Sequence, residues 1–185
     1  MSRLTCYKIT ENEREKPKPK IDTSNVDEIQ AIMASINMGF ERWQTSVILP
    51  PGAGQGQILA TYAREIDALC QRGGYQSVDV VRMYPDHPDR IAMREKFLHE
   101  HIHDDDEVRF FVEGAGAFYI RDQHMVYRMR CDAGDLLVVP KATRHWFDMG
   151  HAPMFCAIRL FTTPDGWQAR FTGDRIADRT PGLDA

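Results

Sequence analysis

Two stretches in the first half of the chain carry apolar residues at helical spacing. They are Val26, Ile29, Ile32, Met33 and Ile36, and then Ile58, Leu59, Tyr62, Ile66 and Leu69. Ser24 or Asn25 offers an N-cap for the first helix, Gly39 offers its end, and Gly73-Gly74 ends the second. We expect both helices to pack against a sheet. Short strands are predicted around the first helix at Leu4–Ile9 and Phe40–Thr45.

From Ser77 onward the pattern changes to short apolar runs separated by turns. A strand begins near Val78, and a short helix is predicted over Pro88–Leu98. The strands that follow are Leu98–His103, Glu107–Val112, Ala117–Arg121, Met125–Met129, Asp135–Val139, His145–Phe147 and Phe155–Phe161. Many short antiparallel strands after a helical start predict an all-β core, of the double-stranded β-helix or jelly-roll type, with a few peripheral N-terminal α-helices.

The length of 185 residues favours one domain over residues 1–185. We expect an N-terminal helical segment of about 1–98 to pack on a β core of about 98–162, followed by a C-terminal tail of about 163–185. The charged stretch 11–20 contains two prolines and predicts a surface loop. The last few residues of the tail are expected to fray.

Composition narrows the classes of partner. The formal net charge is −4 and the chain has no Lys/Arg-rich run, so no nucleic-acid partner is expected. No apolar run approaches the length of a bilayer span, and the N-terminus lacks the apolar core of a signal peptide. The four cysteines are not in CxxC spacing, which argues against a zinc ribbon and predicts reduced thiols. We therefore expect a cytoplasmic protein without a membrane partner, and a monomer because no long apolar edge is evident.

The main concentration of chemically active side chains surrounds an acidic turn. His101 and His103 alternate in an extended stretch and so share one face, from which both can reach one metal ion. The run Asp104–Asp106 predicts a turn, after which Glu107 returns over the two histidines. A third histidine, His145, follows a later strand. Either these are ordinary polar residues, or they converge as metal ligands.

The order of these residues resembles the two sequence motifs of the cupin superfamily. The first is HxHxxxE with Gly114 after it, and the second begins at Gly134 and continues GxxxxxP to the later histidine. Ala142 occupies the position where the second motif usually has glycine. This difference affects the turn but does not change any candidate ligand. A lone HxH would be explained as polar strand residues, but four ligand-type residues in register favour a metal site.

The ligand types limit the metal. Imidazole nitrogens suit Fe(2+), Ni(2+), Co(2+) and Zn(2+), and a carboxylate adds charge and hardness. Four protein ligands on a six-coordinate ion leave two open positions, which suit a substrate that binds through two oxygens. That favours one Fe(2+) or Ni(2+) per chain over structural zinc. Ligand type does not choose between iron and nickel.

Neighbouring charged residues are candidates for further roles. Arg109 shares a strand face with Glu107, so its guanidinium can stabilise an anionic substrate near the open positions. The alternative for Arg109 is a structural ion pair with Asp105 or Asp106. Glu100 and Asp106 point away from the ligands and are candidates to hold a ligand histidine from behind.

Three more side chains leave alternatives open. His99 has the same parity as the ligand histidines, but a fifth ligand would close a needed position, so we interpret it as exposed or bonded to a partner. Phe147 lines the pocket or belongs to the core. Arg159 lies between apolar neighbours and is expected to have a charged partner, which makes it a weaker pocket candidate.

At a finer level the chain resembles the acireductone dioxygenase family in its bacterial form. The matching segments are REKFL at 94–98, EH at 100–101, DDEVRFFVEG at 105–114, HWFDMG at 145–150, AIRLF at 157–161 and GW at 166–167. FERW at 40–43 and GYQS at 74–77 also fit. The resemblance extends from about residue 40 to about residue 176.

The resemblance implies an enzyme of methionine salvage. Its substrates would be the acireductone 1,2-dihydroxy-3-oxo-5-(methylthio)pent-1-ene and O2. In this family Fe(2+) gives 4-methylthio-2-oxobutanoate and formate, whereas Ni(2+) gives 3-methylthiopropanoate, formate and carbon monoxide.

The resemblance also assigns roles by motif position. The metal ligands would be His101, His103, Glu107 and His145. Arg109 would help to generate and hold the substrate dianion. Glu100 falls where the family is credited with a role in metal incorporation, and Asp106 where it is credited with relaying conformational change from the site.

Two other functions remain open at this stage. One is another metal-dependent cupin enzyme, an isomerase or a different dioxygenase, from which Arg109 inside DDEVRFFVEG would distinguish this chain. The other is a non-enzymatic cupin binding module. Sensors of that kind commonly carry a basic DNA-binding helix pair, and no such segment is visible here.

Overall fold

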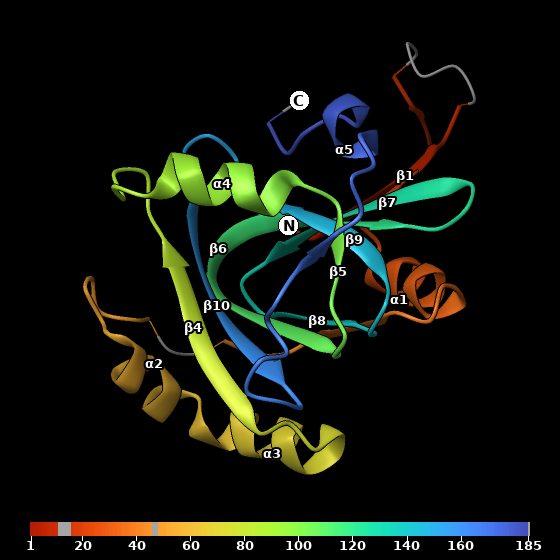
Figure 1. Cartoon of the computed structure of the whole chain (residues 1–185). Helices are drawn as coiled ribbons and strands as arrows, with labels where there is room; N and C mark the ends of the chain where they lie inside the picture. Colours follow the sequence, from red (N-terminus) through yellow and green to blue (C-terminus); the bar gives the residue numbers. More distant parts are fainter. Residues whose placement is uncertain (11–15, 46–47, 185) are drawn as a thin grey trace.

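The structure, a computed structural model, describes residues 1–10, 16–45 and 48–184 (Figure 1). The helices are α1 (Val26–Ser35), α2 (Gln55–Thr61), α3 (Ala63–Gly73), α4 (Arg90–Leu98) and α5 (Ile176–Arg179). The strands are β1 (Arg3–Lys8), β2 (Lys18–Thr23), β3 (Gly39–Arg42), β4 (Ser77–Met83), β5 (His101–Ile102), β6 (Glu107–Arg121), β7 (Met125–Asp132), β8 (Asp135–Val139), β9 (Arg144–Asp148), β10 (Met154–Phe161) and β11 (Arg170–Phe171). Among the described residues, no helix is long and apolar enough to cross a bilayer.

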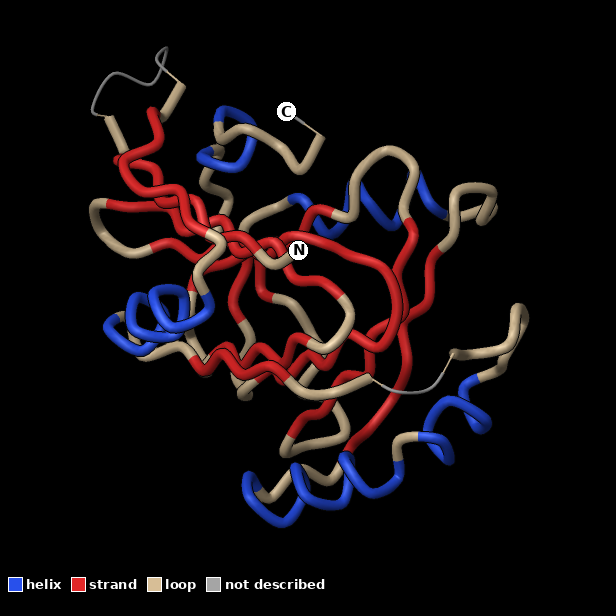
Figure 2. Tube along the Cα trace, turned by 180° about the vertical axis from the view of Figure 1, so that it is seen from behind, coloured by secondary structure: helices blue, strands red, loops and turns tan. Residues whose placement is uncertain are grey.

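The strands form two antiparallel arms that share β6. The first half of β6 lies between β8 and β10, and β3 and β4 extend that arm at its two ends. The second half of β6 lies between β7 and β9, and this arm continues through β1 and β2 on one side and β5 and β11 on the other. The arms curve toward each other into a barrel (Figures 1 and 2). The predicted all-β core with peripheral helices is confirmed.

The bend in β6 corrects one sequence prediction. Glu107–Val112 and Ala117–Arg121 were expected as two strands with a glycine turn between them, but they form one strand. Gly114 adopts a positive φ of 64°, and a Cβ there would lie 1.8 Å from the Met154 carbonyl oxygen. Glycine therefore lets the strand bend against β10 without ending it.

The helix boundaries follow side-chain caps and positive-φ positions. Asn25 caps α1, its side chain accepting from the Glu28 N–H at 3.1 Å. The predicted end at Gly39 is wrong, because Asn37 takes the positive φ of 61° and Gly39 already begins β3. The second predicted helix is divided at Tyr62 into α2 and α3, and it ends as expected at Gly74 with φ 69°.

Three hydrophobic clusters of buried side chains occur among the described residues, and the two larger ones contain most of the core. The interior cluster is rich in aromatic and sulfur-containing side chains, among them Phe111, Phe118, Phe147, Met33 and Met129. The second cluster lies between β6, β8 and β10 and the helices α2 and α3, as the amphipathic patterns predicted. Figure 1 shows α2 and α3 along one side of the barrel beside β4.

Segments expected to be peripheral contribute to the sheets. Residues 18–20 of the predicted charged loop are part of β2, which pairs antiparallel with β1. Asp22 on β2 also accepts hydrogen bonds from Arg3 and Thr5 across the pair. Residues 11–15 of that loop lie outside the described residues. Strands β1 to β4 therefore belong to the sheet although they precede residue 98. The predicted division into a helical segment before residue 98 and a β core after it does not match this arrangement.

Fraying was predicted for residues 179–185; it is wrong for residues 179–184, and residue 185 lies outside the described residues. The Leu183 N–H donates to the buried Asp148 carboxylate at 2.9 Å, and Tyr119 donates to the Pro181 carbonyl at 3.0 Å. Arg128 donates to the Gly182 carbonyl at 3.0 Å. These bonds return the chain end to the barrel wall.

Candidate metal centre

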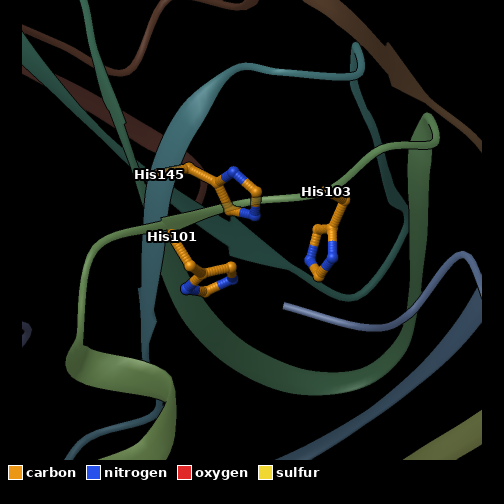
Figure 3. Close-up of side chains that lie close together, drawn as sticks. All are labelled: His101, His103 and His145. Atoms are coloured by element: carbon orange, nitrogen blue, oxygen red, sulfur yellow. The ribbon is translucent and has the colours of Figure 1, made fainter. Parts of the chain in front are cut away.

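Three histidines and one glutamate meet inside the mouth of the barrel. His101 on β5 lies directly opposite His145 on β9, and His103 follows β5 by one residue. Glu107 begins β6, where the chain returns after the acidic turn. All four side chains are buried. The nearest ring nitrogens of the three histidines lie within 4.8 Å of one another, and Figure 3 shows the rings turned toward a common point.

The main chain determines which nitrogen of each ring is free. Each Nδ1 bonds a backbone carbonyl: His101 that of His99 at 2.7 Å, His103 that of Gln168 at 2.9 Å, and His145 that of Thr143 at 2.8 Å. A carbonyl only accepts, so each Nδ1 carries the hydrogen. Each Nε2 then presents a lone pair to the common point, as a metal-binding imidazole must.

Glu107 is the fourth candidate ligand, and its distances from the histidines indicate whether the four side chains suit a cation. Its Oε2 lies 3.3 Å from His103 Nε2 and 3.2 Å from His145 Nε2. Because each histidine hydrogen is on Nδ1, both of these Nε2 atoms face the Glu107 oxygen with a lone pair. Two lone pairs repel at this distance unless a proton or a metal cation lies between them. Burial in a low-dielectric site makes that need stronger. The donor set therefore fits a metal ion.

Burial and Arg109 determine the charge states. Burial alone would raise the pKa of Glu107, but Arg109 and then the histidines reverse the effect and hold that pKa well below its usual range. Burial, and then the neighbouring His145, lower the pKa of His101 to about 4. Burial opposes protonation of His103 as well, yet its bond to Glu107 leaves the pKa raised overall. At neutral pH Glu107 is ionised and His101 neutral, the forms that bind metals.

Arg109 lies beside the candidate ligands with one donor free. It is paired with Glu107 through Nη2, and its Nε donates to Glu107 Oε1 at 3.1 Å. Its guanidinium carbon lies 5.1 Å from the Phe118 ring centre and 5.2 Å from that of Phe147, within cation–π range. Its Nη1 is buried and finds no hydrogen-bond partner in residues 1–10, 16–45 and 48–184. The alternative prediction, an ion pair of Arg109 with Asp105 or Asp106, is wrong, because the carboxylate paired with Arg109 is that of Glu107.

A cavity of about 200 Å³ opens over these groups. Its walls come partly from α4, through Met93, Lys96 and Phe97, and partly from the chain after β10, through Trp167, Ala169 and Phe171. Trp167, Ala169 and Phe171 belong to the segment predicted as a C-terminal tail. The one available signal was Gly166-Trp167 within the family resemblance. Phe147 belongs to both the cavity wall and the core, and Arg159 lines the cavity while paired with Asp79 at 2.6 Å.

Glu100 and Asp106 do not line this cavity. Glu100 is paired with Arg121 at 3.0 Å and accepts from the Thr172 hydroxyl at 2.6 Å. Asp106 accepts from the Lys141 N–H at 2.8 Å. The expectation that either carboxylate bonds a ligand histidine is wrong, because main-chain carbonyls occupy all three Nδ1 atoms. His99 is exposed, as expected, and its carbonyl accepts from His101 Nδ1 while its ring packs against Phe171.

Fold and site together define a metal-binding enzyme of the cupin type. A family model described as the ARD/ARD' family matches residues 6–169. The acireductone dioxygenase of Parvibaculum lavamentivorans is 51% identical over 185 residues, covering 100% of this chain and 98% of that protein. That of Pseudomonas aeruginosa is 46% identical over 184 residues, covering 100% of this chain and 99% of the relative. The chain therefore belongs to the acireductone dioxygenase family, the metal-requiring dioxygenases of methionine salvage.

A solved structure supports the same fold. The acireductone dioxygenase from Bacillus anthracis, with a cadmium ion in its active center, superimposes with a TM-score of 0.78 at 27% identity. The match covers 92% of this chain and 98% of that one. The resemblance seen in the sequence is confirmed over nearly the whole length.

Proposed function

We propose that His101, His103, Glu107 and His145 hold one Fe(2+) or Ni(2+) per chain. The protein then uses O2 to cleave the acireductone 1,2-dihydroxy-3-oxo-5-(methylthio)pent-1-ene. The observation that carries this proposal is the convergence of the three histidine rings, two of which bring Nε2 within 3.3 Å of Glu107 Oε2. The metal in the active center of the Bacillus anthracis relative supports it.

The bound ion supplies a Lewis acid that can hold two neighbouring oxygens of one substrate. The chain supplies the surroundings. Arg109 directs its free Nη1 at an anionic oxygen of the substrate dianion, since a buried donor without a partner is costly until an acceptor arrives. Phe118 and Phe147 hold the guanidinium plane and keep water from its faces.

The product set would depend on the metal. We infer 4-methylthio-2-oxobutanoate and formate from the iron form, and 3-methylthiopropanoate, formate and carbon monoxide from the nickel form. The protein ligands are the same for both ions, so the difference would come from how each ion orients the substrate in the cavity. A single ligand set that suits both metals supports this inference.

Glu100 and Asp106 would act indirectly in this scheme. Glu100, just before β5, is paired with Arg121 at the end of β6 and accepts a hydrogen bond from Thr172 just after β11. Asp106 joins the start of β6 to the turn before β9 through the Lys141 N–H. Roles in metal incorporation and in relaying movement are consistent with these links, because Glu100 directly precedes His101 and Asp106 directly precedes Glu107 in the sequence.

The partners would be the small-molecule substrate and O2. The net charge of −4 and the absence of a Lys/Arg-rich run in the sequence support a small-molecule partner over nucleic acid. A cytoplasmic monomer stays a prediction from sequence.

The direct test is a product assay on protein reconstituted separately with each metal. Anaerobic acireductone is added to the Fe(2+) and the Ni(2+) forms, and then oxygen is admitted. We expect rapid oxygen consumption, with the keto acid from the iron form and carbon monoxide from the nickel form. If one metal ion binds per chain but turnover does not exceed uncatalysed oxidation, the metal site is supported and acireductone is rejected as the substrate. Identical products from both forms would reject the metal-dependent cleavage.

A further inference from the structure

Asp105 binds a second segment of the chain from inside the acidic turn. It is buried, and its Oδ1 accepts from the Thr162 hydroxyl at 2.5 Å and from its neighbour's N–H at 2.8 Å. Its Oδ2 accepts from the Thr163 N–H at 2.8 Å and from the Thr163 hydroxyl at 3.2 Å. Both carboxylate oxygens are thus occupied, and two of the three donor residues belong to the chain just after β10.

That segment, residues 162–168, fits closely around the carboxylate. A Cβ on Gly166 would lie 2.3 Å from Asp105 Oδ2, so the main chain approaches as near as glycine allows. Within the segment, the Gly166 N–H donates to the Thr163 carbonyl at 3.2 Å and the Gln168 N–H to the Asp165 carbonyl at 3.0 Å. The segment therefore forms a tight turn, which we call the 162–168 turn, shaped around one buried carboxylate.

The far end of the 162–168 turn reaches the metal centre. The Gln168 carbonyl accepts from His103 Nδ1 at 2.9 Å, and Trp167 lines the cavity. His103 is the one candidate ligand whose Nδ1 partner lies far away in the sequence, because His99 and Thr143 are each two residues from the histidine they bind. The orientation of the His103 ring thus depends on where a distant segment is held.

We propose that Asp105 is a positioning residue for the metal centre: it holds the 162–168 turn in place, so that the Gln168 carbonyl orients His103. This rests on the proposed metal site and adds a residue outside it. The carboxylate does not line the cavity, and it acts on the turn through three hydrogen bonds from Thr162 and Thr163 and the close approach of Gly166.

The neighbouring Asp104 provides a matched control. It lies one position earlier in the same turn, but its side chain is 82% exposed and pairs only with the exposed Arg170, at 3.0 Å, among the described residues. Asp104→Asn and Asp105→Asn remove the same charge from the same turn. Both replace one carboxylate oxygen with an NH2 group, but only in Asp105→Asn is that oxygen a buried acceptor, which then no longer accepts from the Thr163 N–H or the Thr162 hydroxyl.

The experiment measures Ni(2+) affinity of the metal-free full-length protein by calorimetry, well below its melting temperature. Partners of ligand histidines typically change metal affinity by about 10- to 100-fold, so we expect Asp105→Asn to bind Ni(2+) about 10-fold more weakly. Asp104→Asn should match the wild type within about twofold. Amide hydrogen exchange should show faster exchange at Thr163, Gly166 and Gln168 in Asp105→Asn only.

A purely structural role gives a different result. If Asp105→Asn lowers the melting temperature while Ni(2+) affinity and exchange in the 162–168 turn stay at wild-type values, the proposal is overturned. If the wild type itself binds no Ni(2+), the metal site fails rather than the positioning role. Loss of exchange protection in the turn would then still report whether Asp105 holds it.

A milder second variant guards against misfolding. Thr162→Val removes one donor to Asp105 and keeps the carboxylate. It should weaken Ni(2+) binding by less than Asp105→Asn, and the double variant should be no weaker than Asp105→Asn alone, since both changes break one connection. Strictly additive losses would show that the two residues act independently and would contradict the proposal.

Discussion

At the scale of single residues, the centre depends on which atom of each side chain is already occupied. Three main-chain carbonyls take the Nδ1 hydrogens and leave the Nε2 lone pairs for a cation. Arg109 gives its Nε and Nη2 to Glu107 and keeps Nη1 free. Residue types alone did not reveal these assignments, because each follows from the position of a neighbouring atom.

The free donor of Arg109 leads to a prediction about catalysis. A hydrogen bond to a charged group contributes about 1.5–3 kcal/mol, so Arg109→Met should lower kcat/KM by roughly 100-fold. Bound metal per chain, measured by elemental analysis, should stay the same. Arg82→Met is the control, since Arg82 is a half-buried arginine paired with Glu113 at 2.8 Å that does not line the cavity. Full turnover by Arg109→Met would exclude its role with the dianion.

Lys96 leads to a prediction about substrate capture. It lines the cavity and, among the described residues, has no carboxylate partner, whereas Arg109 and Arg159 are each paired. Lys96→Gln should raise KM several-fold, leave kcat nearly unchanged and weaken the dependence of kcat/KM on salt. Steady-state kinetics at two ionic strengths would check this, with Arg90→Gln at the start of the same helix as control. An unchanged salt dependence would show that Lys96 does not attract the substrate.

At the scale of elements, helix and strand types were largely predictable and their connections were not. Hydrophobic spacing predicted α1, which buries one face, and continuous apolar runs predicted β8 and β10, which are buried on both faces along nearly their whole length. The glycines at 114–116 suggested a turn, since sequence does not distinguish a glycine that ends a strand from one that bends it. The partner strand decides: β10 pairs with β6 on both sides of the bend.

Gly114 gives a stability prediction for this bend. Gly114→Ala should lower the free energy of unfolding by at least about 2 kcal/mol, because it combines a positive φ with a backbone clash at the Met154 carbonyl. Gly56→Ala should be neutral or stabilise by up to about 1 kcal/mol, since Gly56 lies in α2 with open space around it. Denaturant unfolding of both variants measures the contrast. Equal effects would show that the bend does not require glycine.

At the scale of the whole molecule, burial in the hydrophobic interior changes the pKa of side chains that lie outside the metal centre. The Cys6 and Cys156 thiols are fully buried in different hydrophobic clusters. Burial, the largest cause, raises the pKa of each to about 11. The four cysteines are free thiols, as predicted, and three of them are buried.

These thiols predict how stability depends on pH. The unfolded chain loses the thiol protons near pH 9, whereas the folded chain keeps them to about pH 11. Their contribution to stability is therefore fully present below pH 9 and is lost as the pH rises toward 11, by at most about 1.4 kcal/mol per pH unit for each thiol. Denaturant unfolding at pH 8, 9 and 10 under reducing conditions measures the slope. Cys156→Ala should flatten it more than Cys70→Ala, because Cys70 is only half-buried; equal slopes would contradict this assignment.

The sequence by itself determined the fold class, the four candidate ligands and the family, because periodicity and motif spacing are local or follow chain order. Only the tertiary structure decided how the centre is completed. The Gln168 carbonyl at His103, the Trp167 wall of the cavity and the Asp105 contact with the 162–168 turn all join segments far apart in the chain. No local pattern encodes such contacts, since they form when the chain after β10 folds back across β5, where packing and hydrogen-bond geometry determine which atoms meet.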